Sequence, residues 1–156
     1  STRAAAANCA ASSISKPALM CRPTGAAHRL NALYNMTLTV IDAVLTDRGS
    51  RYAVSGTVAG SREAALASLK ALKRNKKFSK ATHNSWGVLL EDGPVKGDDG
   101  EAGAGMVILR MLERENLRNH LVVVTRWYGG KHLGGDRFRH VQTCVETYLA
   151  HIRSAT

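Results

Sequence analysis

The stretch Leu121-Val122-Val123-Val124-Thr125 decides the fold of this chain. Three consecutive valines between a leucine and a threonine leave no polar face, and such a run is typical of a strand that is buried on both sides. The run continues into Arg126-Trp127-Tyr128-Gly129-Gly130, where adjacent glycines end regular structure. The sequence therefore predicts a central strand that delivers charged and aromatic residues into a loop.

Strands and helices are both predicted around this central strand. Apolar and polar residues alternate with a period of two on each side of Gly49, which indicates a β-hairpin, and Leu66, Leu69 and Leu72 recur at helical spacing. The further predicted elements are strands at 36–45, 51–58 and near 83–90, a loop at 91–103, and helices over 61–76, near 104–116 and over 136–153. This pattern predicts a domain that contains both helices and strands.

Length and composition are those of one folded domain. The chain has 156 residues, of which 44% are hydrophobic, so it can bury a core. It contains no uncharged apolar run of the ~20 residues that a membrane-spanning helix needs, and we expect no membrane partner. We expect a tail or linker at 1–35, where alanine and serine are frequent and acids are absent, and a single domain at 36–156.

Cysteine usage and the N-terminal composition bear on localisation. The odd number of cysteines, three, leaves one unpaired in any disulfide scheme and favours a reduced, intracellular setting, so we expect a cytoplasmic protein. An Ala/Arg-rich, acid-poor N-terminus is also typical of transit peptides, which makes an organelle the alternative. Cys144 falls beside the apolar stripe of the last helix, and we expect it in the core rather than as a nucleophile.

Positive charge is concentrated in the first half of the chain. Residues 1–80 carry 13 basic and three acidic side chains, whereas residues 81–156 carry nine of each, so the first half holds the whole net charge of +10. The densest cluster is Lys70, Lys73, Arg74, Lys76, Lys77 and Lys80. A helix dipole favours cations at its C-terminus, but six in eleven residues exceed what capping needs. The cluster fits either a solvated face or an RNA-binding surface on which Trp127 or Tyr128 stacks with bases.

The first of two glycine-rich loops, Gly97 to Gly105, is crowded with carboxylates. Glycines before a helix otherwise favour phosphate, but the acidic side chains oppose it. The acids are expected to cap the helix, to bind magnesium, or to pair with arginines of the second loop. The magnesium ligands would be Asp98, Asp99 and Glu101, and the pairing arginines Arg126 and Arg137. If the strands that enter the two loops are parallel, both loops lie at one edge of the sheet.

The second loop, Trp127–Gly135, combines four glycines with aromatic side chains and many hydrogen-bond donors. Such a loop is able to hold a nucleotide or phosphate. We expect Asp136 to cap the following helix and Arg137, which opposes the helix dipole, to have a carboxylate partner. No nucleophile motif or histidine pair for metal binding is present, so a non-enzymatic domain without cofactor is favoured. An enzyme that uses magnesium and phosphate at the two loops is the open alternative.

Several separated motifs resemble the IMPACT family, whose bacterial members are called YigZ. The motifs are Lys80-Ala81-Thr82-His83-Asn84, Asp98-Asp99-Gly100-Glu101, Val122 to Gly130, Leu133-Gly134 and Asp136-Arg137-Phe138-Arg139-His140. The resemblance implies a two-layer domain like domain 2 of ribosomal protein S5, with a four-stranded mixed sheet and helices packed on one face. It implies a loop site made of His83, Asp98, Asp99, Glu101, Arg126, Trp127, Tyr128, Gly129, Gly130, Gly134, Asp136, Arg137 and His140.

The resemblance also implies a role in translation. Eukaryotic members of the family regulate translation under amino-acid starvation by competing for the activator that switches on the initiation-factor kinase. We therefore expect a non-enzymatic regulatory domain that acts in translation control under stress, with the kinase activator or the ribosome as partner. An RNA-binding module built on residues 70–80 is the first alternative, and the magnesium- and phosphate-dependent enzyme is the second.

Overall fold

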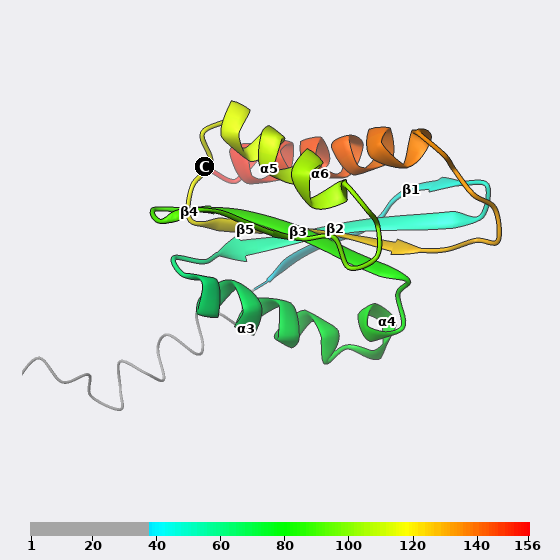
Figure 1. The fold of residues 1–156 in the computed structure, drawn as a ribbon, viewed down its shortest axis with the longest axis horizontal. Helices are drawn as coiled ribbons and strands as arrows, with labels where there is room; N and C mark the ends of the chain where they lie inside the picture. The colour runs from blue at the N-terminus through cyan, green and yellow to red at the C-terminus, as the bar shows by residue number, and fades with distance from the viewer. Residues whose placement is uncertain (1–37) are drawn as a thin grey trace, which may run out of the picture. The chain divides into compact units, whose positions relative to one another are not determined.

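The computed structural model describes residues 38–156, so the tail predicted at 1–35 lies outside the described residues. These residues form an antiparallel sheet with helices on both faces (Figure 1). The strands are β1 (Thr39–Asp47), β2 (Ser50–Val58), β3 (His83–Leu90), β4 (Gly93–Gly97) and β5 (His120–Trp127), in the spatial order β1-β2-β5-β3-β4. The helices are α3 (Arg62–Lys73), α4 (Lys76–Ser79), α5 (Ala104–Arg114) and α6 (Asp136–Ser154). No helix within 38–156 is long and apolar enough to cross a bilayer.

Strand β5 is the centre of the sheet, as its valine run predicts. It pairs antiparallel with β2 on one side and with β3 on the other, so that Val124 lies opposite both Val54 and Ser85. Val122 and Val123 belong to the clusters on opposite faces, and both are completely buried. Because neither face of β5 tolerates water, the fold needs a cover on each side of the sheet.

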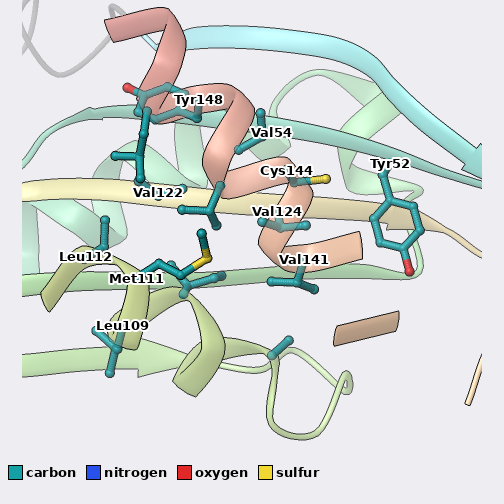
Figure 2. Close-up of a cluster of buried hydrophobic side chains, with 14 of the residues drawn as sticks. Tyr52, Val54, Leu109, Met111, Leu112, Val122, Val124, Val141, Cys144 and Tyr148 are labelled. Carbon is teal, nitrogen blue, oxygen red and sulfur yellow. The ribbon is translucent and has the colours of Figure 1, made fainter. Parts of the chain in front are cut away.

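Helices α5 and α6 cover one face (Figure 1). Val122 and Val124 of β5 pack there with Leu112 of α5 and Val141 of α6 (Figure 2). Cys144 is completely buried in the same cluster, and burial raises the pKa of its thiol to about 12. This burial confirms the expected core position of Cys144. A thiol that stays protonated at neutral pH is also a poor nucleophile.

Helices α3 and α4 cover the other face, which corrects the expectation that all helices pack on one side (Figure 1). Leu69 of α3 and Phe78 of α4 pack there against Val123 and Trp86. The helix predicted over 61–76 ends at Lys73, and a new short helix begins after it. The physical reason for the second layer is that β5 is apolar on both sides.

The sheet has five strands rather than four because a further strand, β4, lies within the predicted loop 91–103. Gly93, with φ of +128°, closes a tight turn directly after Leu90, and β4 then pairs antiparallel with β3. Pro94 is tolerated because β4 is an edge strand. All pairings are antiparallel, so the mixed sheet is also corrected.

The two glycine-rich loops nevertheless lie at one edge of the sheet. Strands β4 and β5 each run antiparallel to β3 and therefore point in the same direction. The chain leaves β4 towards α5 and leaves β5 towards α6 at this edge. The expected meeting of the loops is reached without neighbouring parallel strands.

Replacement of Leu112 by alanine tests the α5–α6 core. Leu112 is completely buried, so we expect Leu112→Ala to lower the free energy of unfolding by about 2–5 kcal/mol in urea denaturation. Leu66→Ala is the matched control because Leu66 is 41% exposed on α3, and it should change stability by no more than about 0.5 kcal/mol. Equal losses from both substitutions would contradict the described packing.

Candidate functional site

An open cleft lies where the loops that follow β4 and β5 meet. Its volume is about 320 Å³. The lining residues are Thr82, His83, Gly100, Glu101, Arg126, Tyr128, His132 and Arg137. Five of these eight belong to the loop site named from the sequence, namely His83, Glu101, Arg126, Tyr128 and Arg137. The structure therefore brings together five predicted residues that lie up to 54 positions apart in the chain.

The floor of the cleft is a buried ion pair. The side chains of Glu101 and Arg126 are only 3% and 6% exposed, and Arg126 Nη1 donates to both carboxylate oxygens, at 2.8 and 3.1 Å. Arg126 Nη2 also lies 3.4 Å from Ser50 Oγ on β2. Arg126 ends β5 and Glu101 lies in the loop before α5, so this pair ties the two loops together as the sequence predicts.

Two further groups approach the Glu101 carboxylate without hydrogen-bonding to it. His83 Nε2 is 3.9 Å from Oε2, and Arg137 Nη1 is 3.8 Å from Oε1. Arg137 thus has the carboxylate neighbour expected for it, but at a distance beyond that of a hydrogen bond. The guanidinium also lies over the ring of Phe138, 4.7 Å from its centroid.

The other two acids of the first loop hold the backbone in place. Asp98 accepts from the backbone N–H groups of Gly103, at 3.2 Å, and Gly105, at 2.8 Å, and so caps α5. Partial burial pushes the pKa of Asp98 up, but these two bonds and Lys96 outweigh it and hold the pKa below 3.8. Asp99 accepts from the N–H of Asn84 at 2.8 Å.

The three carboxylates proposed as magnesium ligands are directed at different donors. Asp98 caps a helix, Asp99 binds the backbone of β3, and Glu101 binds Arg126. Across the described residues, no three His, Cys, Asp or Glu side chains are placed to hold a metal ion together. The carboxylates therefore cap a helix and pair with an arginine, as two of the three expectations state. They are not arranged as a magnesium site.

The glycines of the second loop serve close packing and unusual backbone angles. A Cβ at Gly129 would lie 2.0 Å from the carbonyl carbon of Gly49 in the β1–β2 turn, so only glycine fits there. The N–H of Gly129 donates to Ser50 Oγ at 3.2 Å. Gly130 and Gly134 have positive φ, +95° and +58°, which side chains disfavour. These glycines shape the loop and do not line the cleft.

The adjacent aromatics Trp127 and Tyr128 belong to different surfaces. Trp127 Nε1 donates to the carbonyl of Lys77 at 3.0 Å, and its ring packs on Phe78, 5.5 Å between centroids. Tyr128 lines the cleft, 42% exposed, and its N–H donates to Thr82 Oγ1 at 2.9 Å. Trp127 is therefore part of the α4 side, and of the two only Tyr128 contributes to the cleft.

Asp136 and His140 tie α6 to the β1–β2 hairpin rather than forming the cleft. His140 Nε2 donates to Asp47 Oδ2 at 2.7 Å, and this bond lowers the pKa of Asp47. Asp136 binds Arg48 at 2.5 Å and also Arg139. The helix N-cap is Gly135, without a side-chain bond, so the expectation that Asp136 caps α6 is wrong. Its carboxylate is drawn to the arginines instead.

The segment that forms the cleft matches a known protein family. The sequence model of the Impact N-terminal domain matches residues 48–149, which run from the β1–β2 turn into α6. The chain belongs to the IMPACT family. All the residues that line the cleft lie within the match.

Relatives of this IMPACT domain occur in animals and yeast. Protein IMPACT of Oryctolagus cuniculus is 40% identical over 67% of this chain and 35% of its own length. An IMPACT family member of Saccharomyces cerevisiae is 46% identical over 50% of this chain and 48% of its own length. The chain thus spans about a third to a half of the length of these two relatives.

One solved structure shares the fold. The crystal structure of a hypothetical protein superposes with a TM-score of 0.60, at 22% identity, over 72% of this chain and 60% of that chain. The two-domain translational regulator Yih1 is 33% identical over 73% of this chain and 46% of its own, with a TM-score of 0.47. The first comparison supports an α+β domain of the same architecture.

The basic cluster of this IMPACT domain lies on α3 and α4 and on the residues that directly follow these helices. All six of its side chains are exposed, and we call them the basic face: Lys70, Lys73, Arg74, Lys76, Lys77 and Lys80. Lys77 pairs with Asp42 of β1, and the other five have no ion pair with any residue in 38–156. None of the six lines the cleft, although Lys80 begins one of the family motifs.

Sequence reasoning missed three residues that matter at the site. Thr82 holds the backbone of Tyr128, His132 lines the cleft, and Ser50 lies against both Arg126 and Gly129. Thr82 lies inside one family motif and His132 lies between two, which was a usable signal. Ser50 is 76 residues from Arg126, and nothing in its own surroundings in the sequence indicates the contact.

Replacement of Glu101 tests the ion pair of the IMPACT domain. Glu101→Gln leaves the Arg126 charge buried without a counter-charge, so we expect the free energy of unfolding to fall by about 3–5 kcal/mol in urea denaturation. Glu113→Gln removes the same charge from an exposed position on α5 and should cost less than about 0.5 kcal/mol. A loss from Glu101→Gln no larger than that of the control would exclude a stabilising pair.

Replacement of Asp98 tests the cap on α5 through its pH dependence. A carboxylate whose pKa is lowered in the folded state stabilises the fold above its unfolded pKa, and this stabilisation is lost as pH falls through the folded value. We expect Asp98→Asn to lower the free energy of unfolding by about 1 kcal/mol at neutral pH, and the deficit to shrink from about pH 5 to pH 2. Urea denaturation at a series of pH values measures it, with exposed Asp92→Asn as control. A pH-independent deficit would rule out a role for the Asp98 charge.

Proposed function

We propose that this chain is a binding domain that acts in translation control by contacting the ribosome through its basic face. Membership of the IMPACT family supports the role in translation, since the eukaryotic members that its motifs resemble are translation regulators. The choice of surface rests on five exposed cations, on α3 and α4 or directly after them, that lack an ion pair within the described chain. Unpaired surface cations are the usual contacts of phosphate backbones.

Helix capping accounts for only part of the basic face. Lys70 and Lys73 lie in the last turn of α3, where the helix dipole favours positive charge. Lys76 and Lys77 belong to the four-residue helix α4, and Lys80 follows it. Positive charge therefore continues beyond the end of α3, and within the described residues only Lys77 of this face has an acidic partner, Asp42.

The end of β5 extends this face with an aromatic surface. Lys77 Nζ and the Arg51 guanidinium lie over the Trp127 ring, 5.5 and 5.4 Å from its centroid. The ring is held by its bond to the Lys77 carbonyl, so it is fixed rather than free to splay between bases. This arrangement favours contacts to the sugar-phosphate backbone over base stacking.

Neutralising the basic face tests the proposal. The variant Lys73→Gln, Arg74→Gln, Lys76→Gln and Lys80→Gln removes four charges that no described partner balances. We expect co-sedimentation with purified ribosomes to weaken at least ten-fold and the slope of log affinity against log salt to fall by about 3, since each phosphate contact contributes about 0.7–0.9. The unmodified chain should lose affinity steadily as salt rises.

A control of equal charge separates this surface from net charge alone. Arg110→Gln, Arg114→Gln, Arg118→Gln and Arg139→Gln remove four exposed charges from the α5–α6 side. This variant should keep most of its ribosome affinity. Equal loss of ribosome affinity in both variants would show that binding depends only on the net charge of the chain. Binding to free RNA but not to ribosomes would favour a general RNA-binding module. Recovery of the kinase activator alone from starved cells would favour a protein partner.

A further inference from the structure

The cleft between the two loops holds more positive than negative charge. Two arginines line it against a single carboxylate, that of Glu101, which leaves a net charge of +1 before either lining histidine is protonated. The neighbouring carboxylates of Asp98 and Asp99 are bonded to backbone N–H groups and do not line the cleft. Charge excess of this kind at a concave site attracts anions.

Arg137 has hydrogen-bonding capacity that the described chain does not use. Its nitrogen nearest to Glu101 is 3.8 Å from the carboxylate, and it makes no hydrogen bond to any residue of 38–156. Its Nε is buried without a partner, as is the Nε of Arg126, although the Arg126 side chain is 94% buried. A guanidinium has five donors in a fork that matches the oxygens of a phosphate. Its place in the first turn of α6 adds the positive end of the helix dipole.

One wall of the cleft is aromatic and exposed. The ring of Tyr128, 42% exposed, tilts against His132 with 5.7 Å between centroids. The Arg126 guanidinium lies over the same ring, 5.7 Å from its centroid, and fixes it from the inside. Exposed, fixed aromatic rings beside cationic groups bind flat ring systems by stacking.

We propose that this cleft binds a phosphate monoester that carries an aromatic ring, such as a nucleoside monophosphate. Arg137 binds the phosphate, and Tyr128 stacks on the ring. The volume of about 320 Å³ lies at the small end of ligand pockets, which span about 300–1,000 Å³, and suits a ligand of this size. A phosphate fits better than a carboxylate because its oxygens point in several directions, towards lining donors from α6, the second loop and β3.

Binding of AMP to the 156-residue chain tests the site. Titration followed by amide NMR shifts should show saturable binding with a dissociation constant below about 10 mM. Inorganic phosphate, adenosine and acetate should each bind more weakly than AMP. Arg137→Gln should weaken AMP at least ten-fold. Arg139→Gln removes the same charge from the same helix at a side chain 69% exposed, and should leave affinity within about two-fold.

Two further variants separate the two contacts. Tyr128→Ala should weaken AMP but leave inorganic phosphate unchanged, because only the ring contact is lost. Arg137→Lys keeps the charge without the fork and should weaken AMP less than Arg137→Gln, which guards against a loss caused by misfolding. The proposal is overturned by non-saturable shifts, by acetate binding as tightly as phosphate, or by equal effects of the Arg137 and Arg139 variants. None of these results depends on the basic face, so each proposal stands or fails alone.

Discussion

The burial of β5 on both faces is the constraint on which the rest of this structure depends. A strand without a polar side must be covered twice, and the chain supplies α5 and α6 for one face and α3 and α4 for the other. Residues near the end of β5 are also buried and need partners. Arg126 is 94% buried at its side chain, and a buried guanidinium needs a counter-charge. Glu101 supplies it from the loop before α5, and so the demand of one strand fixes the position of a distant loop.

The same strand separates the two surfaces of the domain. Because successive side chains of a strand point to opposite faces, Arg126 and Trp127 cannot serve the same site. Arg126 lies over the ring of Tyr52 in the α5–α6 cluster, whereas Trp127 packs on Phe78 of α4. The cleft with its Glu101–Arg126 ion pair forms on the Arg126 side of β5. On the Trp127 side lies Lys77 of the basic face. The floor of the cleft and the Trp127 ring therefore belong to opposite sides of β5.

Much of the fold was readable from local patterns. The central strand, the hairpin before it and the bounds of β3 and α6 follow from runs and periodicities of a few residues. Strand β4 was missed because five residues containing a proline and two glycines show no usable alternation. The pairing of loop carboxylates with arginines was predicted as a class, yet the choice of Glu101 rather than Asp98 or Asp99 depends on backbone donors that only the folded loop presents.

The sequence by itself determined which residue types are available and which strand must be central, because charge, apolar runs and glycine positions are properties of short segments. The tertiary structure alone decided that helices cover both faces, that the loops meet without neighbouring parallel strands, and that Ser50 reaches Arg126. It also left Arg137 beside Glu101 yet too far for a hydrogen bond. Such outcomes depend on distances between residues far apart in the chain, and packing of the whole domain sets those distances.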